Sequence, residues 1–242
     1  MTKPQGNAGS GHAFRGVQAW PTMFFLRPWD QHAVHREAII AFLRGLQARQ
    51  SRPVASGVAE GMKSPHGLHE GTFDLLREPH ESLTQLARFI EQTVASAATI
   101  ANGNEVPAEE LIVSVTDSWY HITNEAGFHD AHHHHGCSWC GIYYLQIGES
   151  GRRPGEGAPN GGSRFYCPFL TGGQYVDYGN RYLKGSLDMP LEDGLLLLFP
   201  SFLLHSGLPY RGAQDRIVIA FNSQVHVRAG TAAAARFGGT PA

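Results

Sequence analysis

The sequence contains no long apolar segment and no excess of charge of one sign. No apolar stretch in its 242 residues approaches the roughly 20 residues that a membrane-spanning helix needs. The formal net charge at pH 7 is −2 and there is no run of lysine or arginine, so neither nucleic acid nor a membrane surface is indicated as a partner. Residues 1–19 are polar and glycine-rich and lack the apolar core of a signal peptide.

Cysteine is also scarce, whereas turn-forming residues are abundant. The three cysteines are an odd number, and a disulfide framework would be a poor account of a chain of this length. We therefore expect a reducing, cytoplasmic setting in which the thiols stay free. The 29 glycines and 14 prolines predict many turns, as in a sandwich or barrel of short strands.

The first half of the chain is predicted to be largely helical. Apolar residues recur every three to four positions over 34–46 and again over 83–97, which indicates two amphipathic helices. A β-type run at 20–27 precedes them, and 51–77 is expected to be mostly loop. Apolar stripes of this kind usually pack against a core, so we expect these helices to be scaffold.

The second half is predicted to be a series of short strands. Strands that follow one another without intervening helices favour a barrel or sandwich over a parallel βαβ sheet. Two glycine-rich segments, 148–163 and 171–186, are long for hairpin loops, and we expect them to line the entrance to a site. The predicted strands cover 111–120, 141–147, 164–167, 194–199 and 216–222.

A histidine-rich segment provides the clearest chemical signal. His132 and His134 are two positions apart, so both imidazoles point the same way on an extended strand end. His205 follows a buried apolar run, and a third ligand from there would complete a facial triad with positions left for a bidentate co-substrate and O₂. Arg216 opens the next strand, deep behind the metal. It would need an anionic partner, and a carboxylate is the natural one.

The order and spacing of these residues resemble the 2-oxoglutarate/Fe(II)-dependent oxygenases, in particular a branch with an HxH…H…R pattern. The resemblance runs from Trp119 to Asn222 and extends more weakly upstream. The matching residues are Ser118-Trp119, Gly127, His132, His134, Gly141-Ile-Tyr-Tyr-Leu145, Asn160-Gly-Gly-Ser-Arg-Phe165, Phe199-Pro-Ser201, His205, Arg216 and Phe221-Asn222.

The resemblance implies an activity and a set of site residues. O₂-dependent oxidative decarboxylation of 2-oxoglutarate to succinate and CO₂ would be coupled to oxidation of a C–H bond of a second substrate, in the simplest case hydroxylation. Fe(II) would be held by three histidines, and the arginine, helped by a tyrosine hydroxyl, would pair with the distal carboxylate of 2-oxoglutarate. The implied residues are His132, His134 and His205 for Fe(II), and Arg216, Tyr144, Ser206 and Asn222 for 2-oxoglutarate.

The resemblance also implies the fold: a mainly β chain of the α+β type. We expect a double-stranded β-helix, that is a jelly-roll, cupin-like barrel, with the N-terminal helices packed on one sheet. No linker or internal repeat divides the chain, so a single domain is predicted over 1–242. Its parts are a flexible N-terminus (1–19), a strand with scaffold helices (20–107), the β-helix core (108–228) and a flexible tail (229–242).

The sequence departs from most of the superfamily at the second ligand. The usual pattern is His-x-Asp or His-x-Glu, whereas this chain has His132-x-His134, and an imidazole in place of a carboxylate makes the site more positive. Three ligand sets stay open. They are three histidines, two histidines with the Asp130 carboxylate, or two histidines with a position left for water or halide.

Cys137 and Cys140 form a Cys-x-x-Cys pair that has two other interpretations. A structural zinc site needs four ligands; a second cysteine pair is missing, although histidines could complete the set. A redox pair usually lies in a strand–helix context, which is absent here. We expect Cys140 instead to occupy a small buried position where relatives have serine.

Other functions stay open beside the oxygenase. One is a three-histidine cupin-type metal dioxygenase or isomerase without 2-oxoglutarate, against which the spacing of Arg216 after His205 speaks. The others are a non-catalytic metal-binding barrel and a zinc-stabilised interaction module. Desaturation or halogenation is an alternative to hydroxylation, the second substrate is a small molecule or a peptide- or carrier-bound group, and a homodimer is possible.

Overall fold

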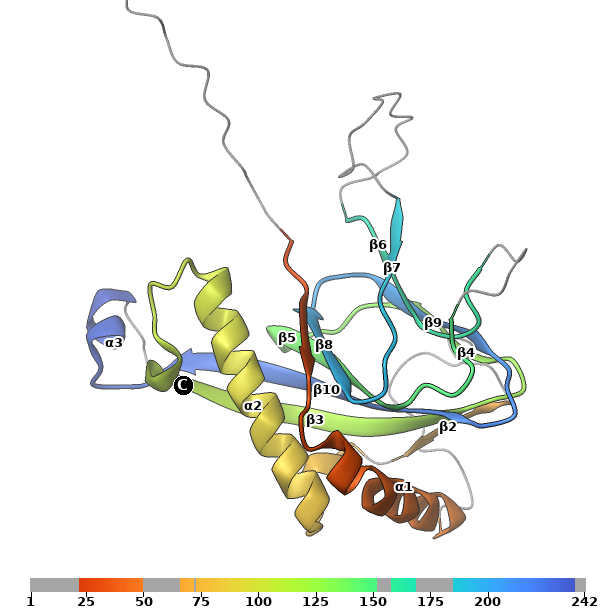
Figure 1. Cartoon of the computed structure of the whole chain (residues 1–242). Helices are drawn as coiled ribbons and strands as arrows, with labels where there is room; N and C mark the ends of the chain where they lie inside the picture. The colour runs from red at the N-terminus through yellow and green to blue at the C-terminus, as the bar shows by residue number, and fades with distance from the viewer. Residues whose placement is uncertain (1–21, 50–65, 72, 152–157, 169–184, 238–242) are drawn as a thin grey trace, which may run out of the picture.

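The computed structural model consists of two antiparallel sheets with helices on one side (Figure 1). It describes residues 22–49, 66–71, 73–151, 158–168 and 185–237. The strand order is β1-β8-β5-β10-β3-β2 in the larger sheet and β4-β9-β6-β7 in the smaller one. The strands are β1 (Phe25–Pro28), β2 (Leu68–Gly71), β3 (Leu111–Thr123), β4 (Gly127–His132), β5 (Trp139–Gln146), β6 (Ser163–Tyr166), β7 (Ser186–Asp188), β8 (Leu195–Pro200), β9 (His205–Tyr210) and β10 (Arg216–Val227). The helices are α1 (His32–Arg49), α2 (Glu81–Ala101) and α3 (Ala232–Phe237), with 3-10 turns η1 (Leu75–Arg77) and η2 (Ala108–Glu110).

Strand β10 organises the larger sheet because it lies between β3 and β5. Successive side chains of a strand point to opposite faces. Ile217 and Ile219 therefore join the core under the helices, while Arg216, Val218 and Ala220 line a cavity on the other face. The central strand thus separates a packing face from a functional face.

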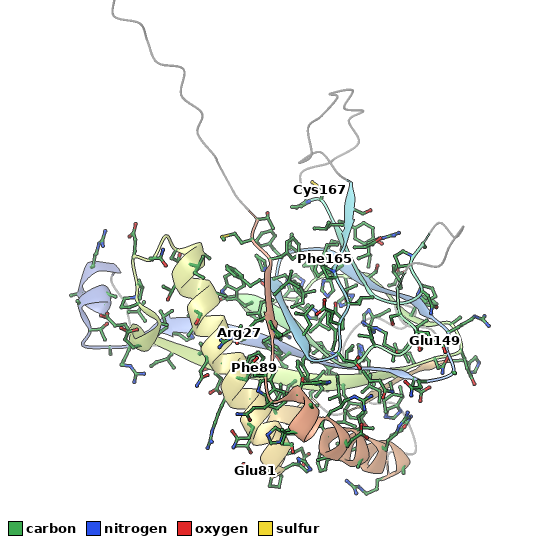
Figure 2. All side chains as sticks on the ribbon, in the orientation of Figure 1. Arg27, Glu81, Phe89, Glu149, Phe165 and Cys167 are labelled. Carbon is green, nitrogen blue, oxygen red and sulfur yellow. The ribbon has the colours of Figure 1, made fainter. Side chains whose placement is uncertain are left out.

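The helices cover the outer face of the larger sheet, as Figure 1 shows. The apolar stripe of α2 is fully buried at Leu83, Leu86 and Ile90, and burial of each such side chain contributes about 1.5–3 kcal/mol. At the edge of this layer, the Arg27 guanidinium of β1 lies 5.1 Å from the ring centroid of Phe89 on α2 (Figure 2). The predicted scaffold role of both helices agrees with this packing.

A second apolar cluster packs between the two sheets. Phe165 on β6 meets Phe199 on β8 edge to face, with ring centroids 4.7 Å apart, and Figure 2 shows Phe165 between the sheets. The same two rings lie 5.5 Å and 4.8 Å from the ring of His205. This cluster therefore supports one predicted metal ligand directly.

The predicted fold class is confirmed: the chain is mainly β, with two antiparallel sheets and the helices packed on one of them. Two segments contain more regular structure than expected. In the segment 51–77, expected to be mostly loop and described only at 66–71 and 73–77, β2 and η1 are formed, and in the segment expected to be a flexible tail, Ala232–Phe237 forms α3, where Ala233 is buried against Ala98, Val106 and Leu111. The expected strand at 20–27 is assigned over Phe25–Pro28.

Several expectations lie wholly or partly outside the described residues. These are the flexible N-terminus (1–19), residues 152–157 of the loop at 148–163, and nearly all of the loop at 171–186. Among the helices in the described ranges, none has both the length and the apolar character needed to cross a membrane.

A tight approach of two backbone segments constrains the start of β4. A Cβ atom added at Gly127 would overlap the carbonyl group of Gly67, which is backbone and cannot rotate away. We predict that Gly127→Ala lowers the free energy of unfolding by about 1–3 kcal/mol in urea titrations, as overpacking does. The control is Gly207→Ala, whose Cβ would meet His129 at an ordinary 3.5 Å. An equal effect of the two substitutions would contradict this account.

Candidate metal centre

Three histidines, two on neighbouring strands of the smaller sheet and one just beyond β4, converge. His132 ends β4 and is paired in register with His205, which opens β9. His134 lies two residues beyond His132 and is held by a 3.2 Å hydrogen bond from its backbone N–H to the Ser201 carbonyl. One possible ligand atom from each of the three histidines lies within 4.8 Å of the others. The structure therefore brings together the three predicted metal ligands.

Backbone carbonyls orient two of these imidazoles. The Nδ1 atom of His132 lies 2.8 Å from the Asp130 carbonyl oxygen, and that of His205 lies 2.9 Å from the Leu203 carbonyl oxygen. A carbonyl can only accept, so in both rings Nδ1 carries the hydrogen and donates. The lone pair of Nε2 is then left for a metal ion, which is the usual arrangement of a metal-binding histidine.

Burial favours the neutral form of two of the three imidazoles. Burial, with a further contribution from the neighbouring His132, lowers the pKa of His134 to about 4. Burial and His132 likewise hold the pKa of His205 well below its usual range. Both rings are therefore neutral near pH 7, and only neutral imidazole binds a metal.

The carboxylate of Asp130 does not take part in this cluster. Asp130 is exposed, and its Oδ1 accepts a 2.7 Å hydrogen bond from the backbone N–H of Ala131. It contributes its carbonyl oxygen instead, which accepts from His132 and, at 3.2 Å, from Nδ1 of His129. The ligand set assembled by the described residues is thus the three-histidine one.

A group of largely buried polar residues that the sequence did not single out lies beside the three predicted metal ligands. The ring centroid of His129 is 3.9 Å from that of His132 and 5.9 Å from that of His121. Nε2 of His121 lies 2.7 Å from Oε2 of Glu70, which is only 3% exposed. Glu70 belongs to β2, and pairing with β3 sets it opposite His121. Because β2 lies in an expected loop, nothing in the sequence indicates Glu70, whereas His129 belongs to the histidine-rich segment 129–135.

The three histidines open onto a cavity of about 430 Å³ between the sheets. Its apolar wall includes Ile142, Val218 and Ala220, from the inner faces of β5 and β10. Its polar lining comes from both sheets and contains acidic, basic and hydroxyl groups. Besides the ligands and His135, the polar residues are Glu70, Asp117, His121, His129, Ser163, Ser206, Arg216 and Asn222.

Arg216 is the unusual charge in this cavity. It is only 6% exposed, and its Nε atom has no hydrogen-bond partner among the described residues. Its guanidinium carbon lies 5.7 Å from the ring centroid of Tyr144. Burial lowers the pKa of Arg216, but a guanidinium stays charged in proteins. A buried positive charge of this kind is stable only with an anion, so the site fits a carboxylate ligand.

The other predicted co-substrate residues occupy different positions. Tyr144 is fully buried and does not line the cavity; its hydroxyl donates a 3.1 Å hydrogen bond to Ser163, which does. Ser206 lines the cavity, with its hydroxyl 3.1 Å from that of Tyr166. Asn222 lies six residues along β10 from Arg216, a span of about 20 Å at strand geometry. Arg216 and Asn222 therefore line different parts of the cavity, far apart along β10.

Removal of any one of the three histidines should abolish tight metal binding. We predict that His132→Ala, His134→Ala and His205→Ala each weaken Fe(II) binding by more than about 100-fold in anaerobic equilibrium dialysis, because loss of a ligand exceeds the effect of losing an outer-shell partner. The controls are Asp130→Ala and His133→Ala, both exposed neighbours, which should bind nearly as wild type does. Loss of binding in Asp130→Ala alone would contradict the three-histidine set.

Comparison with known proteins agrees with this geometry. Residues 117–222 match the model of a family described as "Putative 2OG-Fe(II) oxygenase". No curated protein matches the sequence. Similar solved structures include a prolyl-4-hydroxylase of Pseudomonas putida, with 16% identity and a TM-score of 0.53 over 83% of this chain and 92% of that one.

Two further solved structures share the fold. The alpha-ketoglutarate-dependent epimerase SnoN from nogalamycin biosynthesis has 15% identity and a TM-score of 0.54 over 90% of this chain and 84% of that one. HygX from Streptomyces hygroscopicus, solved with nickel and 2-oxoglutarate bound, has 13% identity and a TM-score of 0.50 over 84% and 83%. Residues 117–222 thus carry the signature of the 2OG-Fe(II) oxygenase family, and the resemblance predicted from the sequence is confirmed.

Proposed function

We propose that the protein is an Fe(II)- and 2-oxoglutarate-dependent oxygenase, in its simplest form a hydroxylase. The observation that carries the proposal is Arg216, a buried guanidinium without an ion pair among the described residues, lining the same cavity as three clustered histidines. Neutral imidazoles suit Fe(II), and a guanidinium suits a carboxylate. The donor set therefore fits both groups, and SnoN and HygX were each solved with a metal and 2-oxoglutarate (alpha-ketoglutarate) bound.

The three histidines would hold iron from one side and leave positions for 2-oxoglutarate and O₂. When bound, iron and 2-oxoglutarate supply an O₂-dependent oxidative decarboxylation that yields succinate and CO₂ and drives C–H oxidation of a second substrate. The protein supplies orientation and exclusion of water. The rings of Phe165 and Phe199 pack against His205, which is buried.

Arg216 would bind the distal carboxylate of 2-oxoglutarate together with Ser163. Because the Tyr144 hydroxyl donates to Ser163, the hydroxyl hydrogen of Ser163 is available for an anion in the cavity. Burial raises the pKa of Tyr144, so its hydroxyl stays protonated and keeps donating. Tyr144 would thus position Ser163 and Arg216 from behind the cavity wall, rather than touch the co-substrate as the resemblance implied.

The second substrate would occupy the other part of the cavity. Phe73, Asp117 and Trp119 line it there, with the ring of Trp119 5.6 Å from that of His134. A bound molecule in that position would present a C–H bond next to the metal. The proposal includes a small-molecule, peptide or carrier-bound substrate. It also includes a reducing, cytoplasmic setting, which the three free cysteines support.

The alternatives fit these observations less well. A three-histidine dioxygenase or isomerase without 2-oxoglutarate gives no role to the buried charge of Arg216. A zinc module built on Cys137 and Cys140 lacks ligands, because no group of three potential ligands among the described residues includes a cysteine. A non-catalytic metal-binding barrel would keep the same site without producing succinate.

The proposed role of Arg216 as the anchor of 2-oxoglutarate is tested most directly by measuring 2-oxoglutarate binding. We predict that Arg216→Ala raises the dissociation constant for 2-oxoglutarate by at least about 30-fold, since truncating one partner of a buried charge pair costs about 2 kcal/mol or more. The readout is the visible charge-transfer band during anaerobic titration of the Fe(II)-loaded protein.

The matched control is Arg228→Ala, an exposed arginine just beyond the far end of β10. It should titrate as wild type does, and both variants should bind iron normally. A wild-type protein that binds iron but shows no band would contradict the use of 2-oxoglutarate, and an unchanged Arg216→Ala titration would contradict the anchor.

A further inference from the structure

Two cysteines beside the cavity have no role in the proposed oxygenase chemistry. The Sγ atoms of Cys137 and Cys140 lie 3.8 Å apart. Cys140 is 2% exposed and lines the cavity, whereas Cys137 is partly exposed. The third cysteine, Cys167, follows β6 on the smaller sheet and lies at the outer end of that strand (Figure 2). The pair is therefore a distinct group with one accessible and one buried thiol.

The backbone around the pair allows the two sulfur atoms to approach. Cys140 is the second residue of β5, but Cys137 lies in the segment between β4 and β5, where no helix or strand is assigned. Gly136, next to Cys137, has a φ of 71°, a left-handed conformation that glycine adopts readily. A disulfide has an S–S length of about 2.05 Å, so closure needs a shift of less than about 2 Å at one side chain.

The pKa values of the two thiols are shifted in opposite directions, which suits them to different steps of an oxidation. A hydrogen bond from Cys140, with a smaller one from Ser201, lowers the pKa of Cys137 to about 7 despite its partial burial. The pKa of Cys140 is raised by its hydrogen bond to Cys137 and by burial. Near neutral pH, Cys137 is thus the accessible thiolate and Cys140 the protected thiol. A thiolate next to a second thiol is the arrangement that gives a reversible disulfide.

We propose that Cys137 and Cys140 form an oxidation-sensitive pair that closes to a disulfide on reaction with hydrogen peroxide. The Cys137 thiolate attacks one peroxide oxygen, the O–O bond breaks, and the other oxygen leaves as water, so that Cys137 becomes a sulfenic acid. The sulfur of Cys140 then displaces the sulfenic oxygen as a second water and forms the S–S bond. Two thiols lose two electrons in total, and one peroxide gains them.

Closure of the disulfide would alter one end of the cavity. The Cys140 Sγ atom also lies 3.3 Å from Oδ1 of Asn222, a second acceptor for its single hydrogen, and Nδ2 of Asn222 lies 3.4 Å from the Asp117 carboxylate. These three residues line the cavity at the end of β10 far from Arg216. A disulfide removes the thiol hydrogen, so Oδ1 of Asn222 loses this donor at the cavity wall. That this would affect the second substrate rests on the proposed function; formation of the disulfide does not.

The pair is tested on the full chain with metal removed by a chelator, so that peroxide reacts with thiols and not with bound iron. One equivalent of hydrogen peroxide should lower the number of reactive thiols, counted after denaturation, from the three free cysteines to one. The intact mass should fall by two hydrogens, and a non-reduced digest should contain the 137–140 linkage. Dithiothreitol should restore all three thiols.

Three variants distinguish the pair from random oxidation. Cys167→Ser should still lose both remaining thiols, because Cys167 takes no part. Cys140→Ser should retain a sulfenic acid on Cys137 that dimedone traps, and Cys137→Ser should keep both remaining thiols at one equivalent of peroxide. Cys137 is partly exposed, so that variant remains informative even if Cys140→Ser fails to fold.

Two results would overturn the proposal. One is a gain of oxygen on Cys137 in the wild-type chain with no loss of the Cys140 thiol. The other is oxidation of Cys167 at the same rate as the pair. Because the assay contains neither metal nor 2-oxoglutarate, its result is independent of whether the chain is an oxygenase.

Discussion

The register of β10 between β3 and β5 is the constraint on which the rest of the structure depends. A shift of one residue would exchange the two faces of the strand. It would place the Arg216 guanidinium under the helices and move Ile217 and Ile219 into the cavity. Burial of a charge without a partner costs several kcal/mol, so the apolar packing of α1 and α2 on one face also fixes the chemistry on the other. The pairing of β10 with β3 and β5 therefore determines which side chains line the cavity and places Arg216 among them.

The electrostatics of the cavity suit a site with three imidazoles and no carboxylate among the candidate metal ligands. Burial keeps His134 and His205 neutral, so the protein ligands add no charge to that of the metal. The two acidic side chains that line the cavity contact other residues: Glu70 lies against His121, and Asp117 lies near Asn222. A co-substrate with two negative charges would then offset two of the three positive charges that Fe(II) and Arg216 carry together. The site is thus built for an anionic ligand.

Much of the fold and the site could be predicted from the sequence, because both depend on local periodicity. His132 and His134 share a strand face, and the apolar run before His205 indicates a buried strand. Glu70 could not be found in this way, since β2 is short and is defined only by pairing with β3. The positions of Tyr144 and Asn222 also needed the structure: the buried Tyr144 hydroxyl donates to Ser163, and Asn222 lies six positions along β10 from Arg216.

The central claim is that this cavity couples 2-oxoglutarate to O₂ at a three-histidine iron site. The most direct test is to incubate the Fe(II)-loaded protein with 2-oxoglutarate in air and to measure succinate by mass spectrometry, with His205→Ala as the matched inactive protein. The account predicts succinate that depends on iron and O₂ and is absent from the variant. Full iron occupancy with no succinate above that of His205→Ala would contradict it and favour a metal-binding barrel without turnover.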